Sequence, residues 1–130
     1  NGGTNPTSVT ITGMSIAPGK VYTVCKTGIM PTNGAAVCDQ TTGAGLWNGN
    51  DAIDLKCGGV QLDVFGQIGN DPGANGWGTG GVTSFHHTLL RQCTVFSGDR
   101  NGSDAFDPAT QWAAYPADTT YTGSRPCPLP

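Results

Sequence analysis

Hydrophobic and polar residues alternate most clearly between Asn48 and Gly73. Two runs, 52–57 (AIDLKC) and 60–65 (VQLDVF), place apolar residues at every second position, and only Gly58-Gly59 separates them. A period of two is typical of a half-buried strand, and a Gly-Gly link favours turns that need positive φ. The stretch therefore predicts an antiparallel β-hairpin. Strict alternation places Ile53, Leu55 and Cys57 on one face of the first strand, and Ala52, Asp54 and Lys56 on the other. In the second strand it places Val60, Leu62 and Val64 on one face, and Gln61, Asp63 and Phe65 on the other.

Other apolar runs predict further strands at Val9–Thr12, Val21–Cys25 and Thr88–Phe96. Pro18-Gly19 is typical of a tight turn. A single helical turn is expected at Ala35–Asp39, and a short turn covering one end of the core at Ala109–Tyr115. No window sustains the 3.6-residue period of a helix, so the chain is predicted to be all-β, with long loops rich in Gly, Asn and Asp and with little helix.

The length of 130 residues suits one domain, predicted to span 1–130 with flexible or tied ends at 1–8 and 121–130. Its 21 Gly and 9 Pro lie between the apolar runs, where they interrupt strands and form turns. Trp47, Trp77 and Trp112 are expected to be partly buried anchors of these loops rather than a displayed row of sugar-binding rings.

The charge pattern argues against nucleic-acid binding. The net charge is −3, and the six basic residues are scattered instead of forming the stripe that phosphate neutralisation requires. No apolar run approaches the ~18 residues of a membrane span, so no span is predicted. The chain also begins without Met, and we expect a processed product.

The five cysteines are Cys25, Cys38, Cys57, Cys93 and Cys127. They lack the spacing of zinc ligands, and disulfides in an oxidising, extracellular compartment are the better interpretation. We expect at least two disulfides, with Cys25–Cys38 the favoured local pair. Because five is odd, one thiol is left free or pairs with another chain.

Several short motifs, taken in order, resemble the lamin-tail domain family. They are NGNDAIDL, LDVFGQIGNDPG, Gly76-Trp77-Gly78, Thr88-Leu89-Leu90-Arg91, GDRNGSDAFDPATQW and Tyr115-Pro116, and they cover roughly 11–123. The resemblance implies an immunoglobulin-like β-sandwich of the kind found in nuclear lamins and secreted bacterial proteins, often beside nucleases. The family's opening strand pair has no counterpart here. A sandwich lacking it would expose an apolar groove and an unpaired sheet edge.

Two candidate sites for ions or modification lie in the loop after Phe96. Asp99, Asn101, Ser103, Asp104 and Asp107 have the oxygen-rich spacing that calcium favours, but Thr110 stands where an EF-hand needs its bidentate acid. Asx-turn scaffolding is the favoured role, with calcium as the alternative and no other cofactor expected. Asn101-Gly102-Ser103 is also the single N-glycosylation sequon.

No catalytic motif emerges from the sequence. His86 and His87 are neighbours whose side chains point to opposite faces of a strand, and neither a nucleophile elbow nor a paired-carboxylate arrangement is present. We therefore expect no enzyme, but a secreted structural or interaction module that assembles with copies of itself or with a strand-donating partner, filaments included. The alternative is an accessory domain of a secreted hydrolase or nuclease that binds substrate or calcium.

Overall fold

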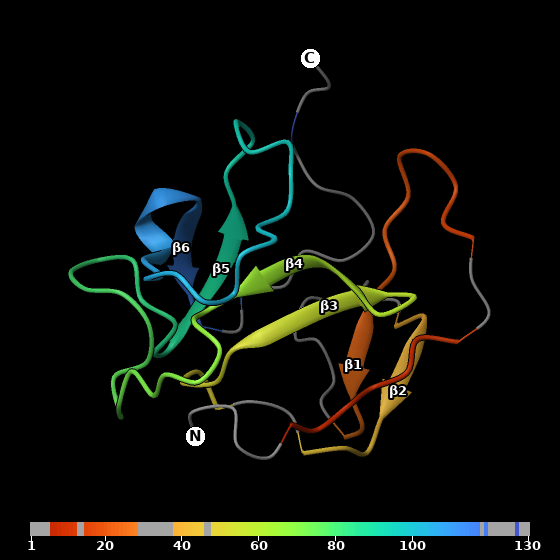
Figure 1. Cartoon of the computed structure of the whole chain (residues 1–130), viewed down its shortest axis with the longest axis horizontal. Coiled ribbons are helices and arrows are strands. Elements are labelled where there is room, and N and C mark those ends of the chain that lie inside the picture. Colours follow the sequence, from red (N-terminus) through yellow and green to blue (C-terminus); the bar gives the residue numbers. More distant parts are fainter. Residues whose placement is uncertain are drawn as a thin grey trace. The chain divides into compact units, whose positions relative to one another are not determined.

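A computed structural model describes residues 6–12, 15–28, 38–45, 48–117, 119 and 127. The chain divides into two compact units, and Figure 1 labels the strands of both. The first unit comprises Asn1–Pro6 and Trp47–Ala117, and the second comprises Thr7–Leu46 and Asp118–Pro130. The single domain expected over 1–130 stays a prediction. Most of the two ends, 1–8 and 121–130, and also Trp47, lie outside the described residues.

The all-β prediction is confirmed, because the described residues form three two-stranded sheets and only one short 3-10 helix. The immunoglobulin-like sandwich is not established by two-stranded sheets. The elements are β1 (Val24–Lys26), β2 (Gln40–Thr42), β3 (Ile53–Cys57), β4 (Val60–Phe65), β5 (His87–Arg91), η1 (Pro108–Thr110) and β6 (Trp112–Pro116).

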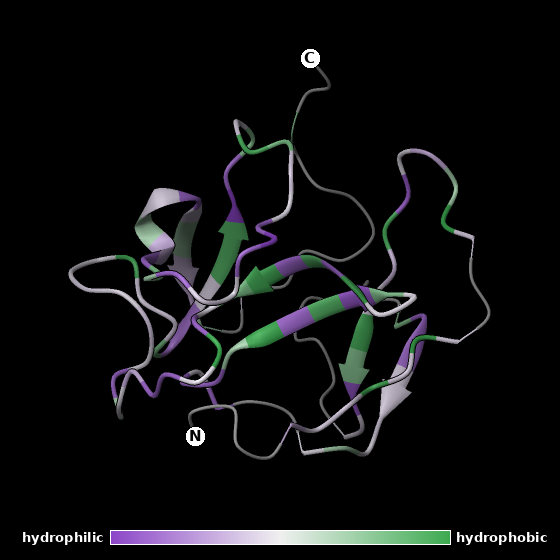
Figure 2. Cartoon of the chain, viewed as in Figure 1, coloured by the Kyte–Doolittle hydropathy of each residue, from purple (hydrophilic) through white to green (hydrophobic). Residues whose placement is uncertain are grey.

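The predicted hairpin is present as β3 and β4, which pair antiparallel. Gly58 and Gly59 have φ of 56° and 81°, so both central residues of the turn occupy the left-handed region. A two-residue turn of this kind matches the right-handed twist of the strands it joins. Figure 2 shows the alternation of apolar and polar residues along both strands.

The hairpin nevertheless differs from strict alternation, since a β-bulge interrupts the register between Leu55 and Lys56. Leu55 pairs with Asp63 but Lys56 pairs with Gln61, which leaves Leu62 as the extra residue of β4. Paired residues share a face, so Val60, the partner of Cys57, lies on the face opposite to Val64. The prediction that Val60 and Val64 share a face is therefore wrong.

In the second unit, β1 and β2 pair in parallel, and the disulfide between Cys25 and Cys38 has a Cα–Cα distance of 5.7 Å. The side-chain amide of Gln40 donates to the Thr10 carbonyl at 2.8 Å and accepts from the Thr12 amide at 3.3 Å. This amide satisfies backbone groups that a neighbouring strand would otherwise bind. It explains why the strand expected at Val9–Thr12 is not formed.

Other local predictions in the second unit are mixed. The turn at Pro18-Gly19 is confirmed by the Lys20 amide, which donates to the Ala17 carbonyl at 3.0 Å, and by a φ of 74° at Gly19. The strand expected at Val21–Cys25 is shorter and shifted, because only 24–26 pair with β2. The helical turn expected at 35–39 falls mainly outside the described residues.

The core of the first unit is aromatic. Val64 and Trp77 are only 1% and 3% exposed, and Pro108 is also fully buried. Phe106 stacks edge-on against Phe65 and Trp77, with ring centroids 4.8 and 5.7 Å apart. Edge-to-face contacts of this kind add to the free energy of burial. The prediction that Trp77 anchors its Gly-rich loop is therefore confirmed.

The segment expected to be a turn at 109–115 is instead η1 followed by β6, which pairs antiparallel with β5. The Asp107 carboxylate accepts from the Ala109 amide at 3.0 Å and begins η1, with Pro108 at its first position. The strand tendency of Trp-Ala-Ala-Tyr is weak, but pairing along the edge of β5 overrides it. β5 itself ends at Arg91, earlier than the expected Phe96.

Candidate functional site

In the first unit, a groove of about 340 Å³ lies between β3–β4 and β5–β6. Its apolar wall is built by residues from all four strands: Ile53, Leu55, Phe65, Leu89 and Trp112. Gly49, Asp51, Asp63, Ser84 and His87 supply the rest of the lining. The register explains the hairpin's share, because Ile53 pairs with Phe65 and Leu55 with Asp63, all on one face.

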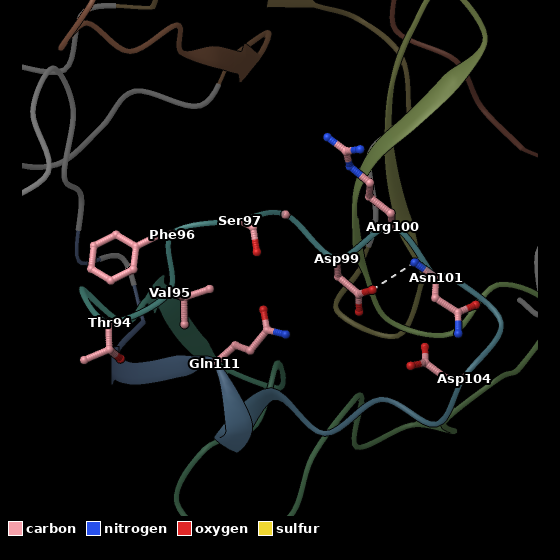
Figure 3. A pocket seen from close by; sticks show the side chains of 10 residues that line it. Thr94, Val95, Phe96, Ser97, Asp99, Arg100, Asn101, Asp104 and Gln111 are labelled. Carbon is pink, nitrogen blue, oxygen red and sulfur yellow. Dashed lines mark hydrogen bonds between the residues drawn. The ribbon is translucent and has the colours of Figure 1, made fainter.

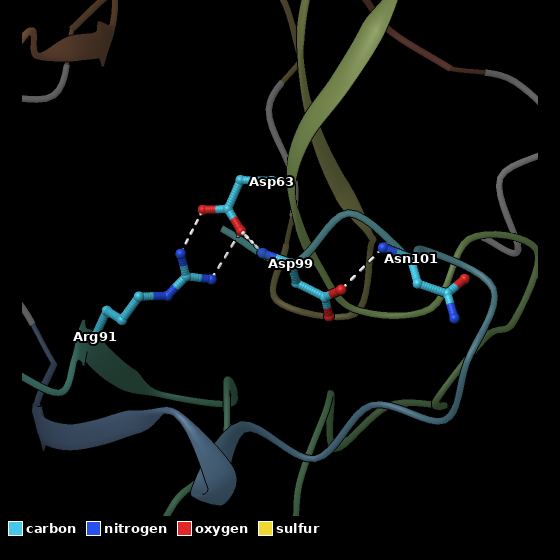
Figure 4. A network of polar contacts seen from close by, with 4 residues as sticks. All are labelled: Asp63, Arg91, Asp99 and Asn101. Carbon is cyan, nitrogen blue, oxygen red and sulfur yellow. Dashed lines mark hydrogen bonds and ion pairs between the residues drawn. The ribbon is translucent and has the colours of Figure 1, made fainter. Parts of the chain in front are cut away.

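One part of the groove is fixed by an ion pair (Figure 4). The Asp63 carboxylate accepts from Arg91 Nη1 at 2.5 Å and Nη2 at 2.8 Å, and also from the Asp99 amide at 2.8 Å. The guanidinium carbon of Arg91 lies 4.7 Å from the centroid of the Trp112 ring. A bidentate pair with a cation–π contact holds both strands in one geometry, so this part of the wall is preorganised.

Ser84, His87 and Asp51 also line the groove, and these residue types occur in hydrolytic triads. Here the Ser84 hydroxyl donates to the Gly49 carbonyl at 2.5 Å and accepts from the Trp77 amide at 2.8 Å. His87 Nδ1 lies 2.8 Å from the Phe85 carbonyl. A nucleophile needs its hydroxyl proton directed at a base, whereas this proton is bound to a carbonyl. These contacts bind Ser84 and His87 to backbone carbonyls.

One strand beside the groove, β3, has an outer edge without a strand partner among the described residues. Within the described part of the chain, the backbone of β3 pairs only with β4. Leu55 is 46% exposed on this edge strand. An edge strand with exposed apolar side chains is a template for pairing with another polypeptide.

The loop that follows β5 forms a second, wide hollow of about 760 Å³ (Figure 3). The predicted calcium residues Asp99, Asn101 and Asp104 line it, together with Phe96, which is 77% exposed. Asp107 contacts η1 instead. The structure thus brings three of these candidate residues together around one open surface.

The side-chain oxygens of Asp99 and Asn101, however, accept hydrogen bonds from within the loop. Asp99 Oδ1 accepts from the Asn101 amide at 2.9 Å, and Asn101 Oδ1 accepts from the Ser103 amide and hydroxyl at 3.3 and 2.7 Å. These are the predicted Asx turns. Among the described residues, no group of three or more His, Cys, Asp or Glu is placed to hold a metal ion. Glycosylation of the exposed Asn101 stays a prediction.

The expected disulfides are confirmed: Cys25 bonds to Cys38 and Cys93 to Cys127. Cys57, which ends β3, is an exposed free thiol. Sequence reasoning identified all five cysteines but left the pairing of Cys93 open. No helix in the described ranges is long and apolar enough to cross a bilayer.

No protein-family model, no curated protein and no solved structure matches the chain. The resemblance to the lamin-tail domain family therefore rests on the residues quoted above and stays a hypothesis.

The sequence contains no direct signal for the groove. It predicted an exposed edge and an apolar hollow only through that family resemblance. The alternation in 52–57 and 60–65 located one wall of the groove, but Trp112 was assigned to a turn and Leu89 to a longer strand. The residue that could have pointed to the groove is Asp63. A carboxylate flanked by Leu62 and Val64 in an apolar strand needs a cationic partner, and Arg91 supplies it.

Proposed function

We propose that this chain is a secreted, non-enzymatic structural or interaction module that binds protein through an exposed sheet edge. The observation that carries the proposal is the groove beside β3, with its apolar wall and the unpaired outer edge of that strand among the described residues. In strand addition, the backbone ladder supplies affinity and pockets for alternate side chains supply specificity. The groove and the edge provide both elements.

Secretion is supported by the two disulfides, because such bonds persist mainly in oxidising compartments. A structural role is supported because the polar side chains that could act in catalysis are already bound to other groups of the protein. Ser84 and His87 bind loop carbonyls, and Asp63 binds Arg91. The first expected partner is another copy of the chain, as a closed dimer or a filament.

Hydrogen exchange tests this proposal when the protein is compared at low and high concentration. We expect the amides of an edge strand to become protected as concentration rises, since a new ladder removes them from water. Leu55→Asp, which places a charge on the groove wall, should abolish that protection. Phe96→Asp is the matched control, because Phe96 is exposed but lies outside the groove. Exchange rates that do not change with concentration would contradict the proposal.

The alternative, an accessory calcium- or substrate-binding domain, is favoured by the open hollow that Asp99, Asn101 and Asp104 line. It predicts that added Ca²⁺ raises the unfolding temperature in proportion to the logarithm of its concentration. Asp104→Asn should reduce that shift. No change in unfolding temperature at millimolar Ca²⁺ would contradict the calcium form of this alternative.

A further inference from the structure

We propose that β3 is a self-complementary edge, through which two copies of this chain pair antiparallel about Leu55 to form a two-fold symmetric dimer. The inference rests on the proposed function and names both the partner and the register. It follows from three features of the strand Ile53–Cys57: the direction of its backbone groups, the order of its charges and the exposure of Leu55.

The backbone direction follows from the turn. Residues that flank a two-residue hairpin loop exchange hydrogen bonds, so the amide and carbonyl of Cys57 face Val60. These directions alternate along an antiparallel strand. Leu55 therefore also bonds toward β4, while the backbone groups of Asp54 and Lys56 point to the outer edge. An incoming strand would bind Asp54 and Lys56.

The charges select the register. When two β3 strands pair antiparallel about Leu55, Asp54 lies opposite Lys56 of the second copy, and Lys56 lies opposite its Asp54. These two positions are also the ones with outward backbone groups, so the ladder and the ion pairs require the same alignment. Within one copy, Asp54 Oδ2 already lies 2.9 Å from Lys56 Nζ, which shows that both side chains share a face.

Other alignments of the same strand bring like charges together. A slip of two residues in either direction sets Asp54 against Asp54 or Lys56 against Lys56, and a parallel pair in register does the same. A slip of one residue turns the apolar face of one copy to the polar face of the other. Like charges directly opposite each other destabilise a pair of strands, so the alignment about Leu55 is the one that the sequence favours.

The opposite face of β3 is apolar and would gain burial. In this register Leu55, which is 46% exposed in one copy, packs against Leu55 of the second copy, and Ile53 meets Cys57. Because the two-fold axis is perpendicular to the sheet, both grooves open on the same side of a four-stranded sheet. The Cys57 thiols do not face each other, so this dimer is non-covalent. Because this pairing occupies the same edge of β3 in both copies, the dimer does not extend into a filament.

Charge reversal tests the register in the intact chain. Asp54→Lys and Lys56→Asp should each weaken dimerisation by about tenfold or more, because each places like charges opposite one another at both symmetric positions. The double variant D54K/K56D restores opposite charges and should regain the wild-type association constant. Circular dichroism and the count of one free thiol check that each variant is folded. Single variants that dimerise as tightly as the wild type would overturn the register.

A cysteine placed at the two-fold axis provides an independent measurement. L55C in a C57S background sets two thiols opposite each other at a pair whose backbone groups point away, the closer kind of antiparallel pair. In a glutathione redox buffer, glutathione disulfide takes the two electrons, and we expect a covalent dimer on a non-reducing gel. F96C in the same background is the control and should stay monomeric, since Phe96 is exposed but not on β3.

The outcomes separate this inference from the proposed function. If the wild type dimerises but neither charge reversal nor L55C responds, β3 is not the interface, and the proposed function stands with another edge. If the wild type stays monomeric at every concentration, self-assembly itself is wrong and both are overturned.

Discussion

Replacing Asp63 by Asn tests the mechanism that holds the groove wall in place. The carboxylate accepts three hydrogen bonds, two from Arg91 and one from the Asp99 amide. An Asn side chain keeps one acceptor oxygen and turns an NH₂ group toward the guanidinium. At least one charge-assisted bond is lost, and the side chain of Arg91, only 13% exposed, loses its counter-ion.

The cost can be bounded from general values. A hydrogen bond to a charged group contributes about 1.5–3 kcal/mol, and breaking a fully buried ion pair costs about 3–5 kcal/mol. Asp63 is 29% exposed and remains partly solvated, so the lower part of this range applies. We expect Asp63→Asn to lower the free energy of unfolding by about 2–4 kcal/mol. The melting temperature should fall by roughly 8 °C or more.

Urea unfolding followed by tryptophan fluorescence measures this change. Asp104→Asn is the matched control: it removes the same charge from the same region, but Asp104 is exposed. The control should change the free energy of unfolding by no more than about 0.5 kcal/mol. If Asp63→Asn were as stable as Asp104→Asn, the ion pair would not hold β4 to β5, and the groove would not be preorganised in the way described.

Three further outcomes are expected. Gly66→Ala should lower the free energy of unfolding by about 2–4 kcal/mol, since the new Cβ would lie 2.9 Å from Trp77 Cε2 at a φ of 90°. Gly80→Ala, whose new Cβ would have nothing within 4 Å, should cost only the φ strain of about 1–2 kcal/mol. Equal losses of stability in urea unfolding would contradict this expectation. Alkylation should add one adduct to the native protein, at Cys57, and five adducts to the reduced protein. Intact mass gives the count, and more than one adduct on the native protein would refute the disulfides. Asp107→Ala should lower the free energy of unfolding by about 1 kcal/mol because the cap of η1 is lost, while Asp104→Ala should be neutral. An equal effect of the two variants in thermal unfolding would show that the cap does not stabilise the fold.

Local chemistry made parts of the fold predictable. Gly58-Gly59 specified the turn because both positions need positive φ, and Cys25 with Cys38 specified a short disulfide loop. The Asx turns of Asp99 and Asn101 were also expected, since these side chains bind backbone groups two residues away. Each of these features depends on residues that are near in sequence.

Features that no local sequence pattern marks were missed. The bulge at Leu62 changes the face of Val60, and nothing in an alternating run marks an extra residue. The strand β6 exists because β5 pairs with it, although its Ala residues favour no strand. The segment 9–12 has strand-forming residues, yet the Gln40 amide takes its backbone groups. The groove combines four such strands, so its lining was not predictable from local pattern alone.

The proposed association of the chain with itself occurs through the edge of β3. Sedimentation equilibrium of the native, oxidised protein over a wide concentration range tests it most directly. We expect the mass to rise from that of one 13.3 kDa chain to twice that value and then to stay constant, because pairing about Leu55 closes the contact. A mass that stays at 13.3 kDa throughout would contradict the account. A mass that keeps growing with concentration would contradict the closed dimer and favour a filament.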